Sequence, residues 1–204
     1  MRRLVASVLL SVFVGIPMSP KNLAAGTVRK ASLQLTTSVV KVRSCFPGHL
    51  GLNLKFTFRN IGREPVIVDK GSFPVRTLVA RSLKAVAAKK YEQEINAHLY
   101  ADIFPMNPTD MSNFAILQPG EAYDLQNEQT RVSLYIDDGA RSSKGDLRPG
   151  SYFLQIEVAT WTYLEDAEQF RRKWQANGLL WAGGVTSEPM PFTVEQNRPI
   201  EKCR

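Results

Sequence analysis

The residues from His49 to Asn60 alternate strictly between apolar and polar side chains in the sequence HLGLNLKFTFRN. One alternate set is entirely apolar and consists of Leu50, Leu52, Leu54, Phe56 and Phe58. The intervening positions from Asn53 onward are polar or charged. Because successive side chains of a strand point to opposite faces of a sheet, this pattern predicts a long β-strand with one buried and one solvated face.

A second alternating run, LRPGSYFLQIEVATW, extends from Leu147 to Trp161 and begins with a Pro-Gly turn. Further short runs rich in apolar and β-branched residues are interpreted as strands at 32–43, 65–69, 76–80, 114–117, 122–125, 131–136 and 190–195. The runs at 49–60 and 65–69 are separated by a short turn, and we expect them to pair as a hairpin. Many short strands separated by Pro-Gly turns predict an all-β sandwich.

Two segments depart from the strand pattern. Residues 82–90 are rich in Ala and Lys, and Ser82 is a suitable N-cap for a short helix. Residues after Trp161 show apolar side chains at helical spacing, with acids early and bases late, and Asn177-Gly178 would end that helix. Residues 91–103 are compatible with a helix or a strand. We therefore expect insertions near 82–110 and 162–184.

The motif Leu147-x-Pro149-Gly150-x-Tyr152 resembles the tyrosine corner of immunoglobulin-like and fibronectin-like sandwiches. The resemblance implies that the Tyr152 hydroxyl caps the backbone at the corner while Leu147 packs beneath the turn. The alternative is an ordinary Pro-Gly turn followed by an aromatic core residue.

The turns at 60–62 and 119–121 extend this pattern to one that resembles exported bacterial immunoglobulin-like modules, some of which are proteinase-inhibitor domains of bacilli. The expected fold is an immunoglobulin-like antiparallel β-sandwich with short helical insertions. The resemblance rests on turn residues, so no functional residue is transferred from it.

The N-terminal segment has the layout of a secretory signal peptide. Arg2 and Arg3 precede an uncharged apolar run at 4–18, and the small residues Ala24 and Ala25 follow. The alternative, a membrane anchor, needs about 20 apolar residues, which is longer than this run. We expect residues 1–25 to be removed, and residues 26–204 to form a single exported domain, without a membrane span, in the periplasm or outside the cell.

The chain contains two cysteines, Cys45 and Cys203. An even number of cysteines in an oxidising compartment predicts one disulfide, which would enclose nearly the whole mature chain. The alternative is a pair of free thiols.

Charge and motifs argue against several classes of function. The full chain has a formal charge of +7, and residues 1–25 contain Arg2, Arg3, Lys21 and no acid, which leaves +7 − 3 = +4. No block of basic residues is interleaved with aromatics, so we predict no nucleic-acid partner.

The chain shows no nucleophile, metal or phosphate-binding motif, and its two histidines, His49 and His98, are not at metal-binding spacing. The turn at Asp137-Asp138-Gly139 offers oxygen ligands for calcium, but it lacks the further acids of a calcium loop and is interpreted as a solvated turn. We predict a protein that is not an enzyme and has no cofactor.

Four aromatic residues near the second insertion are candidate binding residues: Trp161, Tyr163, Trp174 and Trp181. Their side chains either pack the second helix onto the sheets or form an exposed platform, because indole combines a large apolar area with a hydrogen-bond donor.

Three functional hypotheses follow. The first is an exported, non-enzymatic immunoglobulin-like module that binds a protein partner, or has a structural role, at the cell envelope or outside the cell. The second is a secreted proteinase inhibitor that uses a loop at 104–113 or 139–146. The third is a carbohydrate-binding module, which requires Trp161, Trp174 and Trp181 to lie side by side in solvent.

Overall fold

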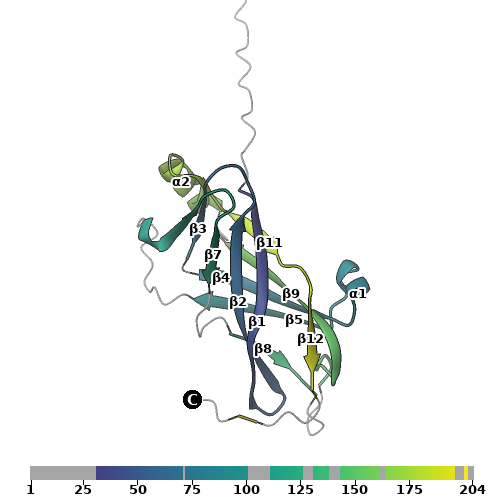
Figure 1. Ribbon diagram of the computed structural model, residues 1–204. Helices are drawn as coiled ribbons and strands as arrows, with labels where there is room; N and C mark the ends of the chain where they lie inside the picture. Colours follow the sequence, from purple (N-terminus) through teal and green to yellow (C-terminus); the bar gives the residue numbers. More distant parts are fainter. Residues whose placement is uncertain are drawn as a thin grey trace, which may run out of the picture.

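The structure is a computed structural model that describes residues 31–70, 72–100, 111–125, 131–137, 143–160, 164–195 and 200–201. Most of these residues lie in β-strands, and nearly all strand pairs are antiparallel (Figure 1), which confirms the all-β prediction. The predicted signal peptide at 1–25 lies outside the described residues.

The first sheet is built around the long alternating strand. Its four strands are β1 (Leu33–Phe46), β2 (His49–Asn60), β7 (Ala122–Leu125) and β8 (Arg131–Tyr135). Strand β2 pairs with β1 on one side and with β7 and β8 on the other. The apolar set of β2 predicted to be buried, from Leu50 to Phe58, is at most 2% exposed. The alternation therefore identified both the strand and its buried face.

The second sheet contains the other alternating run. Its five strands are β4 (Ser72–Ala80), β5 (Gln93–Tyr100), β9 (Gly150–Thr160), β11 (Gly183–Thr186) and β12 (Met190–Val194). Strand β9 pairs with β4, β11 and β12, and β5 is an edge strand beside β4. Buried side chains of the first and second sheets form one hydrophobic core. In Figure 1 strands β4, β5 and β9 of the second sheet cross behind β1 and β2.

The predicted insertion near 82–110 contributes a strand to this second sheet. Helix α1 (Leu83–Ala87) begins after Ser82, whose hydroxyl accepts a hydrogen bond from the Ala85 backbone N–H at 3.1 Å, as predicted for an N-cap. The chain then returns as β5 antiparallel to β4. The ambiguous residues after Tyr91 therefore form a strand.

A third, small sheet lies at one end of the molecule. Its strands are β3 (Val66–Asp69), β6 (Phe114–Leu117) and β10 (Leu179–Leu180). Strand β6 pairs antiparallel with β3, after the short 3-10 helix η1 (Met111–Asn113), and β10 pairs parallel with β3. Helix α2 (Leu164–Trp174) lies beside β3 in Figure 1. Its Phe170 and Trp174 form a buried cluster with Ile67, Phe114 and Leu180.

Glycine is required where β10 approaches β3. Gly178 has φ 149°, and a Cβ atom added there would lie 2.6 Å from the Pro65 carbonyl oxygen. The absence of a side chain lets the backbones approach, and the Leu179 N–H then donates to that same carbonyl at 2.8 Å.

The predicted hairpin between 49–60 and 65–69 is wrong, because β2 belongs to the first sheet and β3 to the third. Asn60, which is fully buried, directs the chain from one sheet to the other. Its side-chain Nδ2 donates to the carbonyls of Glu64 at 2.8 Å and Leu117 at 2.9 Å, and its Oδ1 accepts from the Gly62 N–H at 2.9 Å. One amide thus fixes the turn after β2 and ties it to the end of β6.

A buried glutamine joins the two larger sheets. Gln93 of β5 donates from Nε2 to the carbonyls of Tyr135 at 2.5 Å and Gly145 at 2.8 Å, and its Oε1 accepts from the Tyr135 N–H at 3.2 Å. The side-chain amide therefore pairs with the backbone of β8 much as a neighbouring strand would.

Tyr152 has the geometry expected of a corner tyrosine. Its hydroxyl donates to the Arg148 carbonyl at 2.6 Å, four residues upstream, and its ring is 1% exposed. Gly150 has φ 148° in the turn between them, and Leu147 is buried in the main core. The Arg81 guanidinium lies 4.4 Å from the ring centroid. The turn and strand β9 are thus held in register by one side chain.

Replacing Tyr152 by phenylalanine should remove this hydrogen bond while retaining the buried ring. We expect the free energy of unfolding to fall by about 1 kcal/mol, the usual contribution of one such bond. Urea denaturation measures the change. Tyr135→Phe is the matched control, since that ring is 50% exposed, and should change stability by less than about 0.5 kcal/mol. Equal stabilities of the Tyr152 variant and the parent protein would contradict a role for the hydroxyl.

Candidate functional site

The exposed aromatic platform is not formed by the two tryptophans that the structure describes. Trp174 is 5% exposed and Trp181 is 4% exposed. Trp174 packs on Phe170 in the small cluster under α2, whereas Trp181 packs on Phe58 in the main core, with ring centroids 5.6 Å apart. Of the two alternatives, packing holds for these two residues and the exposed platform does not, because one ring fills the cluster under α2 and the other fills the main core. Trp161 and Tyr163 lie outside the described residues.

A hollow of 760 Å³ lies on the solvent face of the second sheet, over β4, β5, β9 and β11. We call it the sheet groove. On this face the small residues of its lining are Pro74, Ala159 and Gly184, and the polar residues are Arg76, Asn96, Glu157 and Thr186. The open centre follows from sequence, since Ala159 and Gly184 lie opposite each other in adjacent strands and together supply a single methyl group.

Strand alternation places the charged residues of the groove. In β4 the side chains of Val75, Thr77 and Val79 are buried, so Arg76 faces solvent. Arg76 lies opposite Glu157 of β9 on one side and Asn96 of β5 on the other. Three neighbouring strands therefore present their polar side chains at the same level of the sheet.

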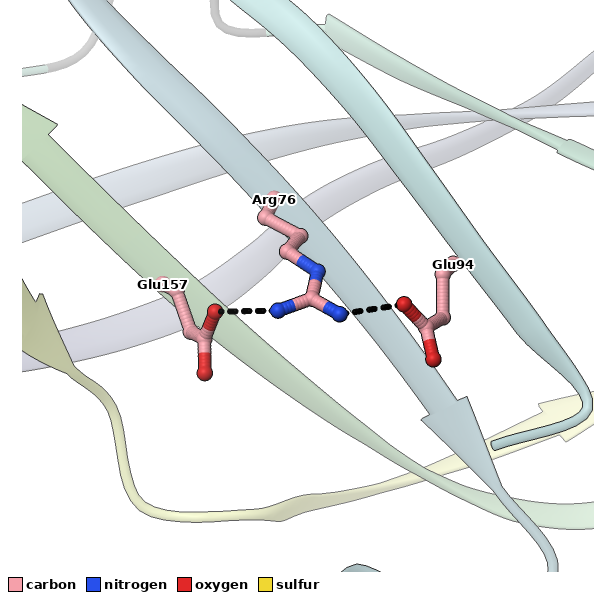
Figure 2. Close-up of polar contacts among 3 residues, drawn as sticks. All are labelled: Arg76, Glu94 and Glu157. Carbon is pink, nitrogen blue, oxygen red and sulfur yellow. Dashed lines mark hydrogen bonds and ion pairs between the residues drawn. The ribbon is translucent and has the colours of Figure 1, made fainter. Parts of the chain in front are cut away.

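Arg76 makes ion pairs with carboxylates on both neighbouring strands (Figure 2). Its Nη1 lies 3.2 Å from Oε2 of Glu157, and its Nη2 donates a hydrogen bond to Oε2 of Glu94. We call these three residues the Arg76 cluster. The hydrogen bond with Glu94 is the main reason that the pKa of Arg76 is raised above its usual value. With one cation and two anions, the cluster has a net charge of −1.

The second oxygen of each carboxylate is directed away from the guanidinium in Figure 2. The side chains of the cluster are 37% to 46% exposed, so the cluster lies at the surface. The pKa of the nearby Tyr91 phenol is raised by burial and, to a smaller extent, by the negative charge of the Glu157 carboxylate. Exposed ion pairs contribute little to stability because water and salt screen them. The arrangement is suited to presenting fixed hydrogen-bond acceptors at the surface.

Of the two histidines singled out from the sequence, the structure describes the side chain of His49 alone. His49 packs on Tyr135 on the first sheet, with ring centroids 5.1 Å apart. Asp137 follows β8, while Asp138 and Gly139 lie outside the described residues. Within the described part of the chain, no three His, Cys, Asp or Glu side chains are placed to hold a metal ion.

Most of the first inhibitor-loop candidate, 104–113, and half of the second, 139–146, also lie outside the described residues.

Of the helices that the structure describes, none combines the length and apolar character needed to cross a bilayer.

The cysteine pair is only partly described. Cys203 lies outside the described residues, so the disulfide stays a prediction. The backbone nevertheless brings the C-terminal segment to Cys45, because the Glu201 N–H donates to the Ser44 carbonyl at 2.7 Å.

The sequence contains a weak signal for the groove. Strands β4, β5 and β9 each have a charged residue at an outward position, as in RTLVA, QEINA and QIEVA. That signal identifies solvent-facing residues, but only the pairing of the strands shows that Arg76 lies between Glu94 and Glu157.

No protein-family model and no curated protein matches the chain. Among solved structures, the chain is similar to beta-glucosidase 3B from Thermotoga neapolitana, determined in complex with alpha-D-glucose, with a TM-score of 0.23 and 13% identity. The match covers 80% of this chain and 17% of that enzyme, so the chain spans about a sixth of its length. A similarity at this TM-score assigns neither a fold nor an activity.

Proposed function

We propose that this protein is an exported, non-enzymatic, immunoglobulin-like module that binds a protein partner through the sheet groove, at the cell envelope or outside the cell. The observation that carries the proposal is the groove itself. Its volume of 760 Å³ lies within the range of about 300–1,000 Å³ that is usual for binding sites, and it combines a small apolar floor with a few fixed polar groups.

The immunoglobulin-like part of the proposal rests on two features. Two antiparallel sheets share one core, and the Tyr152 hydroxyl returns to the backbone at the Pro149-Gly150 corner. The small third sheet and α2 add to that plan at one end of the molecule. Export is proposed from the basic start, the apolar run and the small residues near Ala25.

Filling the groove tests the proposal. A Cβ atom at Gly184 would meet only the Val158 carbonyl oxygen, at 3.7 Å, so Gly184→Phe is compatible with the backbone. We expect the variant to fold and to lose at least about tenfold in affinity for the partner, because the ring occupies the hollow. The measurement is quantitative capture from the native envelope fraction, with the mature protein as bait.

Ser151→Phe is the matched control. Ser151 is exposed on the same face of β9, but it lies six residues from Glu157, which is about 20 Å along a strand. Proteins retained by the parent and Ser151→Phe baits but lost with Gly184→Phe are groove partners. An identical set of captured proteins with all three baits would refute binding through the groove.

A further inference from the structure

We infer that the groove accepts an extended segment of the partner that carries a lysine or arginine side chain beside small apolar side chains. This inference rests on the proposed function and specifies the chemistry of the partner. It follows from the charge of the Arg76 cluster and from the shape of the hollow beside it.

Charge complementarity favours a cation. The chain as a whole is basic, with 26 Lys and Arg against 19 Asp and Glu, whereas the Arg76 cluster has two carboxylates for one guanidinium. Arg76 binds one oxygen of each carboxylate, and the second oxygens are directed away from it (Figure 2). An ammonium or guanidinium can therefore bind the second oxygen of either carboxylate without displacing Arg76.

Arg76 also prepares the site for such a ligand. Its ion pairs to β5 and β9 hold Glu94 and Glu157 on either side of β4, so less side-chain freedom is lost when a ligand binds them. The outward oxygen of Glu157 is then an acceptor in the lining of the hollow, and that of Glu94 is a second acceptor on β5, on the other side of Arg76.

The shape of the groove favours a polypeptide. It crosses four adjacent strands, β5, β4, β9 and β11, which is a width of about 14 Å at the usual strand spacing. About four residues of an extended chain span that distance. The facing Ala159 and Gly184 leave room at the centre for the side chains of such a segment but offer them no charge. Small apolar residues next to the basic one therefore fit best.

Two synthetic peptides test the inference directly: acetylated and amidated Ala-Val-Lys-Val-Ala and the same sequence with Glu in place of Lys. Each is titrated to about 5 mM, in the range of weak peptide affinities, into 15N-labelled mature protein. We expect only the lysine peptide to shift the amide signals of Arg76, Glu94, Glu157 and Gly184. Raising the salt concentration to about 0.5 M should weaken its binding, because exposed charges are then screened.

Variants separate charge from shape. Changing both Glu94 and Glu157 to Gln should lower affinity for the lysine peptide at least about tenfold while retaining the volume of the side chains. Glu168→Gln is the matched control, since Glu168 is also an exposed carboxylate paired with an arginine, Arg171, but lies on α2. It should bind the peptide as the parent protein does. Thermal denaturation of each variant verifies folding.

The outcomes distinguish this inference from the proposed function. If the lysine peptide fails to bind, or binds no better than the glutamate peptide, the inference is overturned. Loss of envelope capture by Gly184→Phe would still support the groove as the binding site, for a partner of other chemistry. Lysine-peptide binding that disappears with the paired Glu→Gln changes supports the inference.

Discussion

Asn60→Ala is expected to lower the free energy of unfolding by about 3 kcal/mol, which is three hydrogen bonds at about 1 kcal/mol each. The side-chain amide of Asn60 is fully buried and satisfies the carbonyls of Glu64 and Leu117 and the N–H of Gly62. Alanine leaves those backbone groups without their partner in a region that excludes water. The loss should appear in urea denaturation as a lower midpoint with an unchanged slope.

Two further variants identify the cause. Asn60→Asp keeps an acceptor for the Gly62 N–H but loses the donor and directs a carboxylate at two carbonyls, so it should destabilise at least as strongly as alanine. Asn96→Ala changes an exposed asparagine in β5 and should alter stability by less than about 0.5 kcal/mol. A loss below about 1 kcal/mol for Asn60→Ala would show that water replaces the amide.

The strands could be predicted from the sequence, but the strands with which they pair could not. The alternation of β2 and β9 gave each strand and its buried face, because a period of two residues depends only on local backbone geometry. The four residues of β3 are all buried, so they carry no alternation. Nothing in them distinguishes a hairpin with β2 from pairing with β6 and β10, which follow much later in the chain.

The helical patterns likewise predicted the elements themselves but not the surfaces on which they pack. The Ser82 cap and the apolar stripe of α2 predicted two helices, and both are present. The stripe did not show which surface would cover it. Trp174 fits an apolar helix face whether that face meets a sheet or solvent, and only the packing of α2 on the small sheet decides that the ring is buried.

The groove could not be predicted from the sequence, because it depends on which strands are neighbours in the sheet. Arg76, Glu94 and Glu157 are each ordinary outward-facing residues of a strand, and they are far apart in the sequence. They meet because β4 lies between β5 and β9, and the hollow beside them exists because two small residues from β9 and β11 face each other. Non-local strand order creates the site.

Breaking the proposed disulfide between Cys45 and Cys203 should lower the free energy of unfolding by about 2–5 kcal/mol. The cross-link would enclose nearly the whole mature chain, so its removal gives the unfolded chain much more freedom. The backbone supports the pairing, because Glu201, two residues before Cys203, donates to the carbonyl of Ser44, the neighbour of Cys45.

A double-mutant cycle separates the cross-link from local contacts of either sulfur, such as the 3.2 Å contact between Arg131 Nη2 and Cys45 Sγ. If the two sulfurs are bonded, Cys45→Ser, Cys203→Ser and the double variant should lose nearly equal stability, because each removes the same bond. A reductant should destabilise the parent protein and leave the double variant unchanged. Peptide mapping of the exported protein without reduction supplies the direct test. Recovery of both cysteines as alkylated thiols, together with additive losses in the cycle, would show that the C-terminal segment is held at Ser44 by its hydrogen bond alone.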